Sequence, residues 1–166
     1  MSKLFYSLPF TYGLYYYSND ILTYFLNKLN PETAHNIAIY ALKNNVYIKN
    51  NDYKSDRLKI DLLNKNFKNP IGLAAGFDKN AVAYPALFKY NFSFIEVGTL
   101  TLSERNGNKK PRIFRDNNTN TIINSCGLNN NGVFKIKNNI IHNNKLIDNS
   151  NILGISISSI TNKNDY

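Results

Sequence analysis

The sequence predicts an α/β fold with parallel strands, because short strands of the fully buried type alternate with helical segments. Three apolar runs have the composition of strands covered on both faces, and they lie at residues 71–75, 92–100 and 151–157. Residues 80–90 and 133–146 lie between these runs and show a helical pattern, although Pro85 should bend or shorten the first of them. Small or hydroxyl residues end the strands, which is where α/β proteins usually place their chemistry.

Composition limits the classes of function. The 166 residues, 43% of them hydrophobic, allow one domain with a substantial core. The single cysteine, Cys126, excludes an internal disulfide and fits a reducing compartment. The formal charge of +9 favours anionic partners. Its densest basic cluster lies on an expected hairpin and comprises Lys109, Lys110, Arg112 and Arg115. A generic basic surface explains this cluster as well as a nucleic-acid face does, and no recognition motif accompanies the charge, so no nucleic-acid partner and no metal site are expected.

The first 45 residues predict a small helical subdomain. Residues 4–17 are rich in tyrosine and phenylalanine, which favour a membrane–water boundary but also occur in ordinary cores. Two apolar stripes at helical spacing follow, comprising Ile21, Leu22, Phe25, Leu26 and Leu29, then Ala34, Ile37, Ala38, Ala41 and Leu42. Ser18 or Asn19 should cap the first helix, and Asn30-Pro31-Glu32 should begin the second. The pair is either a helical hairpin packed on its own domain, which periodicity favours, or a surface for a membrane or an apolar ligand. No apolar run reaches the ~18 residues of a membrane span.

Residues 69–79 carry the clearest site signal. Ala74, Ala75 and Gly76 place nearly bare backbone at a strand end, where a flat ligand can lie against the main chain. Asp78 and Lys79 follow at once. The plainer alternative is a strand–loop–helix connection in which Asp78 caps the helix and Lys79 points into water.

Further strands and a polar loop complete the pattern. Residues 58–62 should pair with a strand through Phe67 across a turn at residues 64–66, and residues 112–115 with 121–123. The amide of Asn124, after the second hairpin, suits the edge of a pyrimidine because it both donates and accepts. Glu96 lies within the strand at residues 92–100 and needs a partner if it faces inward, for which Lys79 is one candidate.

Several motifs, in this order, resemble class 2 dihydroorotate dehydrogenase, the quinone-linked, membrane-associated flavoenzyme of pyrimidine synthesis. Each motif is weak alone, but the ordered set over most of residues 18–157 is specific. The motifs are Asn30-Pro31-Glu32-Thr33-Ala34-His35, Lys68-Asn69-Pro70-Ile71-Gly72-Leu73-Ala74-Ala75-Gly76-Phe77-Asp78-Lys79, Glu96-Val97-Gly98-Thr99, Lys110-Pro111-Arg112-Ile113-Phe114-Arg115, Asn124 with Gly127 and Asn129-Asn130-X-Gly132, and Gly154-Ile155-Ser156-Ile157.

The resemblance implies a fold, a cofactor and site residues. It implies the N-terminal part of a (β/α)₈ TIM barrel, with about three barrel strands in residues 46–166, preceded by a two-helix subdomain in residues 1–45 that docks on the membrane and admits quinone. The flavin mononucleotide (FMN) positions are Ala75, Gly76, Phe77, Asp78, Lys79, Thr99 and Ser156. The positions for dihydroorotate or orotate are Lys79, Asn124, Ser125, Cys126, Gly127 and Leu128. The location it implies is peripheral, on the cytoplasmic side of the cell inner membrane.

This sequence also departs from the family pattern. Ser156 stands where the family has a flavin-contacting asparagine, the loop at Ser125-Cys126 and Leu128 is less bulky, and residues 102–106 lack the usual prolines. The serine base, a later lysine and asparagines, and the phosphate-binding end of the barrel have no counterpart. A (β/α)₈ barrel needs ~250 residues, so the chain is expected to be truncated and inactive alone. A C-terminal fragment that completes the barrel is then one partner, and the alternative is a non-catalytic membrane-surface protein derived from the enzyme.

Overall fold

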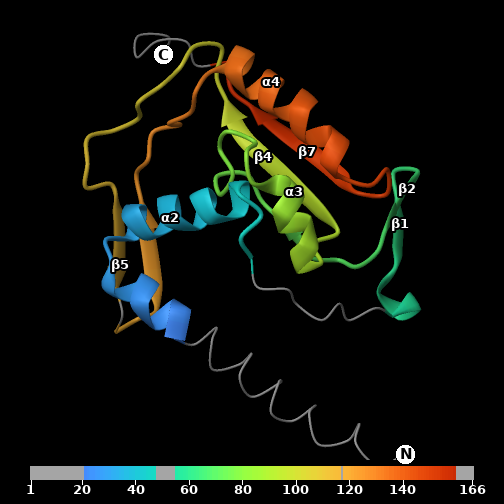
Figure 1. Ribbon diagram of the computed structural model, residues 1–166, viewed down its shortest axis with the longest axis horizontal. Coiled ribbons are helices and arrows are strands. Elements are labelled where there is room, and N and C mark those ends of the chain that lie inside the picture. Colours follow the sequence, from blue (N-terminus) through green and yellow to red (C-terminus); the bar gives the residue numbers. More distant parts are fainter. Residues whose placement is uncertain (1–20, 48–54, 117, 160–166) are drawn as a thin grey trace, which may run out of the picture.

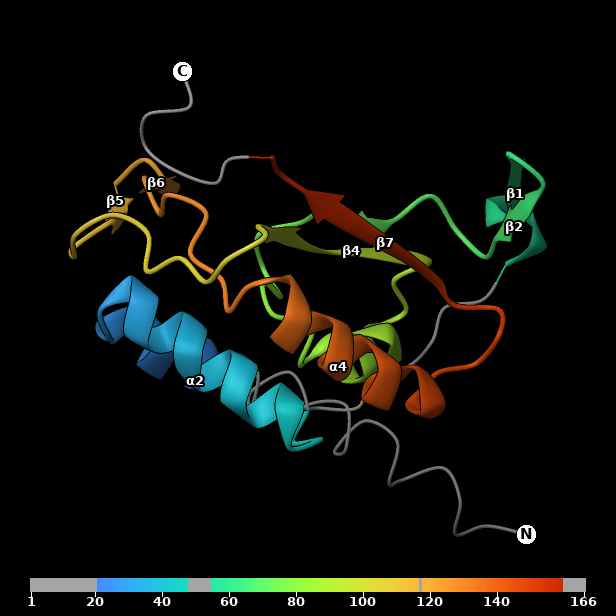
Figure 2. The same cartoon turned by 90° about the horizontal axis from the view of Figure 1, so that it is seen from above.

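A small parallel sheet with helices on one side forms the centre of the molecule, so the α/β prediction is confirmed (Figures 1 and 2). The computed structural model describes residues 21–47, 55–116 and 118–159. In Figure 2, the helices α2 (Pro31–Lys43), α3 (Tyr84–Leu87) and α4 (Val133–Asn143) all lie on the same side of the sheet. Parallel strands normally have both faces covered, and here the described helices cover one of them.

The sheet contains three strands in the order β3-β4-β7. They are β3 (Gly72–Leu73), β4 (Phe94–Leu100) and β7 (Ile152–Ile157). Both pairings are parallel, with Leu73 opposite Ile95 and Ile95 opposite Leu153. The three expected strands are therefore present, but β3 is shorter than the apolar run at residues 71–75, because the chain turns across the end of the sheet from Ala74 onward.

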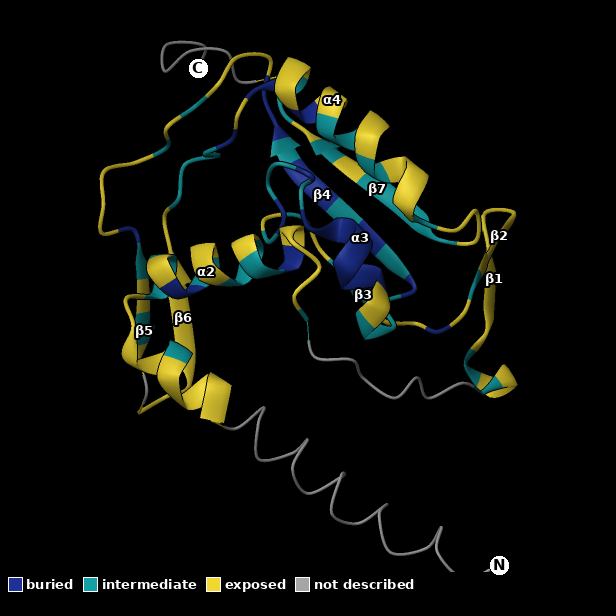
Figure 3. Cartoon of the chain, viewed as in Figure 1, coloured by how far each residue is buried: buried dark blue, intermediate teal, exposed yellow. Residues whose placement is uncertain are grey.

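The core lies between β4 and the helices. Ile95 and Val97 on β4 are completely buried, and they form one cluster with Tyr84 of α3 and Ile136 of α4. Figure 3 shows this buried region as the dark blue of α3 and β4. The hydroxyl of Tyr84 lies 2.8 Å from Oδ1 of Asn144, at the end of α4, so the two helices are also joined by a polar contact.

The helix expected over residues 80–90 is wrong in its first part. Residues 80–83 are not helical, and Ala81 has a φ of 53°. α3 begins at Tyr84, and Pro85 lies in its first turn instead of its interior. A proline is favoured there because its missing N–H has no partner to lose. The 3-10 turn η2 (Phe88–Tyr90) continues the chain.

Asp78 is buried and caps the segment that leads into α3. Its carboxylate accepts hydrogen bonds from the backbone N–H groups of Val82 at 2.9 Å, Ala83 at 2.7 Å and Tyr84 at 2.8 Å. Burial raises the pKa of Asp78, and the backbone donors oppose that rise. The capping role that the sequence offered as an alternative is therefore what the structure shows.

The two N-terminal helices form as expected. Residues 21–28 are helical, and α2 follows after a break. Asn30 caps α2, since its side-chain oxygen accepts from the N–H of Glu32 at 3.0 Å, and Pro31 occupies the first helical position. α2 packs against α3 and against the hairpin strand β5 (Ile113–Asp116). The expected cap at Ser18 or Asn19 and the aromatic segment at residues 4–17 lie outside the described residues.

Two antiparallel hairpins flank the sheet. One joins β1 (Ile60–Leu62) to β2 (Lys65–Phe67), and the other joins β5 to β6 (Thr121–Asn124). The turn expected at residues 64–66 is wrong, because Lys65 and Asn66 belong to β2. The loop is Leu63-Asn64, both with positive φ, which matches the strand twist in two-residue hairpins. The remaining short elements are the 3-10 turns η1 (Asp56–Leu58) and η3 (Asn144–Leu146).

Part of the apolar surface of the sheet is uncovered. Ile155 is 47% exposed and Ile157 is 77% exposed, and both share the face of β7 on which Leu153 packs against the core. Because side chains alternate along a strand, this places an exposed apolar stripe on the helix side of β7. Among the described helices, none is both long and apolar enough to cross a bilayer.

Removal of the Asp78 carboxylate should weaken the fold. We expect Asp78→Ala to lower the free energy of unfolding by about 1–3 kcal/mol, because it removes the acceptor of three backbone N–H groups at a buried site. The measurement is urea unfolding followed by circular dichroism. Asp56→Ala is the matched control, because the Asp56 side chain is 91% exposed and its ion pair with Lys59 lies at the surface. Equal losses in the two variants would contradict a structural role for the cap.

Candidate functional site

The loop at residues 74–79 is held across the ends of β3 and β4. Gly76 donates its N–H to the carbonyl of Gly98 at 2.8 Å, and Gly98 donates to the carbonyl of Asp78 at 3.2 Å. Gly98 has a φ of 109°, and a Cβ there would lie 2.6 Å from the carbonyl oxygen of Ser156. A side chain at Gly98 would therefore separate the loop, β4 and β7, which meet at this point.

Small residues form an open shelf on this loop. Ala74 and Gly76 are exposed, and Ala75 is half-buried. A Cβ added to Gly76 would meet no heavy atom within 4 Å, so the space beside its backbone is open. A flat ring system can approach the main chain closely there, and the shelf fits a flavin in this respect.

Two hydroxyl groups meet at the carboxyl ends of β4 and β7. The Oγ1 atom of Thr99 and the Oγ atom of Ser156 lie 2.9 Å apart, and either can donate to the other. Each hydroxyl retains capacity for another partner. The parallel pairing of β4 with β7 brings these residues together although 57 positions separate them in the sequence.

Lys79 points back into the molecule instead of into water. Its ammonium group donates to the carbonyl of Gly76 at 2.6 Å. Burial lowers the pKa of Lys79, and the charge of Arg112 lowers it as well, while Cys126 and Glu32 act in the opposite direction. Lys79 forms no ion pair with Glu96 in the described part of the chain, so the pairing considered for these two residues is not found.

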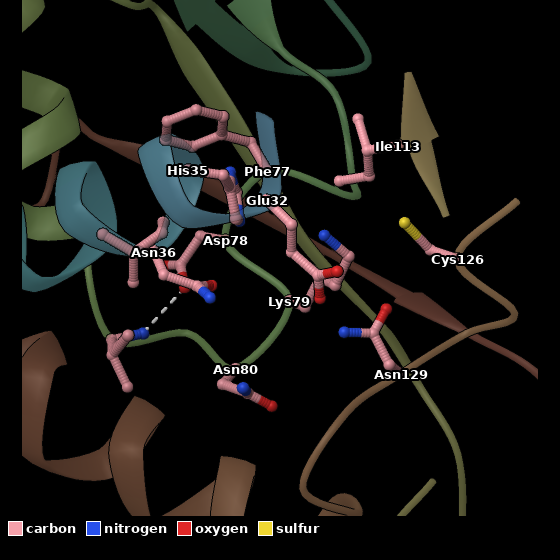
Figure 4. Close-up of a pocket in the computed structure, with 12 residues that line it drawn as sticks. Glu32, His35, Asn36, Phe77, Asp78, Lys79, Asn80, Ile113, Cys126 and Asn129 are labelled. Carbon is pink, nitrogen blue, oxygen red and sulfur yellow. Dashed lines mark hydrogen bonds between the residues drawn. The ribbon is translucent and has the colours of Figure 1, made fainter. Parts of the chain in front are cut away.

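A cavity of about 90 Å³ lies between α2 and this loop (Figure 4). Glu32, His35, Asn36 and Ile39 line it from α2, and Phe77, Asp78, Lys79, Asn80, Val82, Ile113, Cys126 and Asn129 complete the wall. Pockets that enclose a drug-sized ligand measure ~300–1,000 Å³, so the cavity does not enclose a flavin. The flavin shelf and this cavity are therefore two different parts of the site.

The cavity brings together polar groups that the sequence analysis did not assign to a site. His35 packs edge-on against Phe77, with ring centroids 5.2 Å apart. Burial lowers the pKa of His35 from its usual 6.5, and the charge of Lys79 lowers it further, while Glu32 acts in the opposite direction. The Oδ1 atom of Asn129 is buried and has no hydrogen-bond partner among the described residues, so it is available to a ligand's donor group.

A pattern in the sequence could have identified the residues of α2 that line the cavity. Glu32, His35, Asn36 and Ile39 recur at the i, i+3, i+4, i+7 spacing of a single helical face. This face differs from the apolar stripe, in which Ala34 and Leu42 are buried and Ile37 is exposed. The sequence pattern thus contained two faces on α2, and only the apolar one was interpreted.

The middle residue of the loop at residues 124–128, Cys126, lies against the same cavity. Asn124 ends β6, and Asn124 and Ser125 are exposed, whereas Cys126, Gly127 and Leu128 are half-buried. Cys126 lines the cavity with Lys79, but Asn124 does not line it. The structure therefore places Asn124, the expected pyrimidine reader, outside the set of residues that line the cavity.

Asn130, which the sequence analysis left unassigned, anchors the end of this loop. It is buried and donates to Oγ1 of Thr101 at 2.8 Å and to the carbonyl of Leu128 at 2.7 Å. Its side-chain oxygen accepts from the N–H of Gly132 at 2.8 Å, just before α4. The start of α4 and the end of the loop are therefore fixed to the segment that follows β4.

Arg112 corrects the interpretation of the basic cluster. Its side chain is only 5% exposed, and its Nη2 atom lies 2.6 Å from Oε1 of Glu32. Arg115 also makes a specific contact, with the carbonyl of Asn27 at 2.8 Å. A generic basic surface is therefore wrong for Arg112, because a buried guanidinium is retained where it has partners for its fixed set of donors.

The fold and the geometry described above define an α/β protein with a candidate site at the carboxyl ends of parallel strands. Comparison with known sequences makes this specific, because the profile of the dihydroorotate dehydrogenase family matches residues 57–166. The chain belongs to the dihydroorotate dehydrogenase family.

Individual relatives agree with this assignment. The chain is 45% identical over 104 residues to a dihydroorotate dehydrogenase (quinone) of Sinorhizobium fredii, covering 63% of this chain and 29% of that protein. It is 37% identical over 136 residues to the protein of the same name from Shewanella halifaxensis, covering 80% and 39%. A crystal structure of dihydroorotate dehydrogenase from Eimeria tenella superposes with a TM-score of 0.72 and 33% identity, covering 78% of this chain and 36% of that one. The chain thus spans about a third of the length of the relatives that it matches.

The contact between Glu32 and Arg112 should make stability depend on pH. Hydrogen bonding to Arg112 holds the pKa of Glu32 below its usual 4.5. A lowered folded-state pKa gives stability that is present above pH 4.5 and is lost as the pH falls through the folded pKa. We expect the fall in unfolding free energy between pH 6 and pH 3 to be smaller in Glu32→Gln than in the unchanged protein, measured by urea unfolding. Identical slopes in the two proteins would mean that this carboxylate is not linked to folding.

Proposed function

We propose that the chain supplies the first part of a flavin-dependent, quinone-linked dihydroorotate dehydrogenase. The observation that carries this proposal is the meeting of the small-residue shelf, Lys79 and the paired hydroxyls of Thr99 and Ser156 at one edge of a parallel sheet. Membership of the family supports one common ligand for these groups in the proposal. The substrates are then dihydroorotate and a quinone, as the names of the relatives indicate.

The shelf and the strand ends would hold FMN. The residues proposed for this role are Ala75, Gly76, Phe77, Asp78, Lys79, Thr99 and Ser156. FMN, when bound, would supply the acceptor of the hydride that leaves C6 of dihydroorotate, and the donor of the electrons that pass to quinone. The small residues allow the ring to lie on the main chain, and the hydroxyls offer hydrogen bonds to its polar edge. Asp78 acts indirectly, because its carboxylate is occupied by the cap and fixes the shape of the loop.

The pyrimidine would lie between Lys79 and the loop at residues 124–128. The proposed residues are Lys79, Asn124, Ser125, Cys126, Gly127 and Leu128. Asn124 offers a donor and an acceptor to the edge of the ring, and the ammonium of Lys79 offers positive charge to an anionic substrate. The exposed position of Asn124 on β6 leaves its amide accessible to that ring.

The two N-terminal helices would contact the membrane surface and admit the quinone. Ile21, Leu22 and Phe25 are 48–63% exposed on the first helix, and Ile37 and Tyr40 are exposed on α2. Such apolar side chains favour an interfacial position, which we place on the cytoplasmic side of the cell inner membrane. In this proposal, the cavity that His35 and Ile39 help to line would receive the quinone ring.

Turnover would also need groups that these residues do not supply. Deprotonation of C5 requires a base within hydrogen-bond reach of that carbon's proton, and the family resemblance assigns this base to a serine without a counterpart in the sequence. In this proposal the later barrel strands would supply these groups, whether they are continuous with residues 1–166 or belong to a partner polypeptide. The alternative, a non-catalytic membrane-surface protein, differs in needing no such partner.

The activity test uses a polypeptide of residues 1–166. We expect it to retain no stoichiometric FMN after gel filtration and to show no dihydroorotate-dependent reduction of a quinone analogue, because a positioned base alone contributes ~10²–10⁴-fold to the rate.

Addition of a polypeptide carrying the later two thirds of the Shewanella halifaxensis relative should restore turnover. Lys79→Ala should abolish the restored activity, and Lys89→Ala, on η2 away from the cavity, is the control that should not. Turnover by residues 1–166 alone would overturn the proposed need for a partner, and no restoration by the added polypeptide would favour the non-catalytic alternative.

The membrane test uses deletion of residues 1–44. We expect the full chain to sediment with liposomes of anionic lipid and the shortened chain to remain in the supernatant, because the exposed apolar side chains at positions 21–40 are removed. Ile122→Ser and Ile123→Ser on β6 provide a control that reduces exposed apolar surface outside these helices. If the shortened chain sediments as strongly as the full chain, the helices are not the membrane element.

A further inference from the structure

The side chain of Arg112 joins two parts of the site that are far apart in the sequence. Its Nε and Nη2 atoms both donate to Oε1 of Glu32, at 3.2 and 2.6 Å, in the first turn of α2. Its Nη1 atom donates to the carbonyls of Asn106 at 2.6 Å, Asn108 at 3.1 Å and Cys126 at 3.4 Å. One buried guanidinium therefore contacts the helix on one side and the loop at residues 124–128 on the other.

Backbone hydrogen bonds join the same segments, and the side chain of Asn108 also donates to the carbonyl of Ser125 at 2.7 Å. The carbonyl of Cys126 accepts one further backbone hydrogen bond, from Asn108 at 3.0 Å, and the N–H of Ser125 donates to the carbonyl of Arg112 at 2.9 Å. A Cβ at Gly107 would overlap both the Cys126 carbonyl and the Arg112 guanidinium, so the backbone at residue 107 packs tightly against the contact. Arg112 thus holds the loop with both its main chain and its side chain.

The cavity lies between the same two parts. Glu32 and Cys126 both line it, with Lys79 between them (Figure 4). A ligand that displaced α2 would move Glu32 and leave the buried guanidinium without its charged partner, which is energetically costly. A shift of the guanidinium would then reach the three carbonyls to which it donates.

We propose that Arg112 and Glu32 couple the cavity beside α2 to the loop at residues 124–128, with Arg112 as the positioning residue for that loop. The pyrimidine-reading role of the loop rests on the proposed function, whereas the coupling itself does not. A lysine cannot replace Arg112, because only the planar guanidinium has enough donors in the right directions to serve both sides. Loss of the Glu32 carboxylate on α2 should consequently loosen the loop around Cys126, which lies 94 positions later in the sequence.

Cys126 provides a direct measurement, because it is the only cysteine in the chain. The rate of Cys126 modification by 5,5′-dithiobis(2-nitrobenzoic acid) would be measured under native conditions in the unchanged chain, Glu32→Gln, Arg112→Lys and the double variant. We expect each single change to raise the rate roughly tenfold or more, since each weakens hydrogen bonds to a charged group. The double variant should react no faster than the faster single variant, because both changes break one contact.

Two controls separate this coupling from a general loss of stability. Lys110→Gln removes an exposed contact with the same carboxylate, at 3.2 Å, and should leave the rate within about twofold. Tyr84→Phe weakens the core away from the loop and should not accelerate labelling under native conditions. Rates measured at several low urea concentrations add a second criterion, because local opening of the loop depends little on urea whereas global unfolding depends strongly on it.

The outcomes are distinct. An unchanged rate in a folded Glu32→Gln variant would overturn the coupling, as would acceleration by Tyr84→Phe equal to that in Glu32→Gln, or a strongly urea-dependent rate in Glu32→Gln and Arg112→Lys. Acceleration confined to Glu32→Gln and Arg112→Lys would support it. Protection of Cys126 by orotate, measured in the complex with the added C-terminal polypeptide, tests the proposed function separately: acceleration without protection by orotate would leave the coupling intact and count against pyrimidine binding.

Discussion

The buried carboxylate of Asp78 is the contact on which the arrangement of the site depends. It accepts three backbone hydrogen bonds from the segment entering α3, while the carbonyl of the same residue accepts from Gly98 on β4. One residue thereby fixes the helix start, the strand end and the loop between them. Ala74 and Gly76 remain exposed on this fixed loop and form the shelf. A site that receives a flat ring needs both a fixed loop, which Asp78 supplies, and an open face, which Ala74 and Gly76 supply.

Local chemistry in the sequence was sufficient to predict most of the elements. Asn30 followed by Pro31 identifies the start of α2, because a cap and a proline act within one turn of the helix. The apolar run around Ile95 identifies β4, because Ile95 and Val97 are completely buried against the helices. The errors occur where two local rules compete. Pro85 could bend a long helix or begin a short one, and the backbone N–H groups that donate to the Asp78 carboxylate fix the short helix.

The site was predictable where strand ends generate it and unpredictable where distant side chains meet. Thr99 and Ser156 lie together because both end neighbouring parallel strands, which the order of the elements implies. Arg112 and Glu32 are 80 positions apart, and no periodicity connects them. Composition placed Arg112 among surface charges, whereas its burial depends on the packing of α2 against β5. Asn129 was equally unpredictable, because the chain is rich in asparagine and only the burial of its Oδ1 atom beside the cavity distinguishes it from its neighbours.

The pairing of β4 with β7 has a consequence for the order in which the protein is made. β4 ends at Leu100 and β7 begins at Ile152, so residues 101–151 must be synthesised before the central strand can gain its second neighbour. At ~5–20 residues per second, that interval lasts roughly 3–10 seconds. Throughout it, one edge of an apolar strand has no partner from its own sheet, and unpaired edges of this kind attract other chains. Chaperone binding during translation would therefore be most useful in that interval, before the sheet can form.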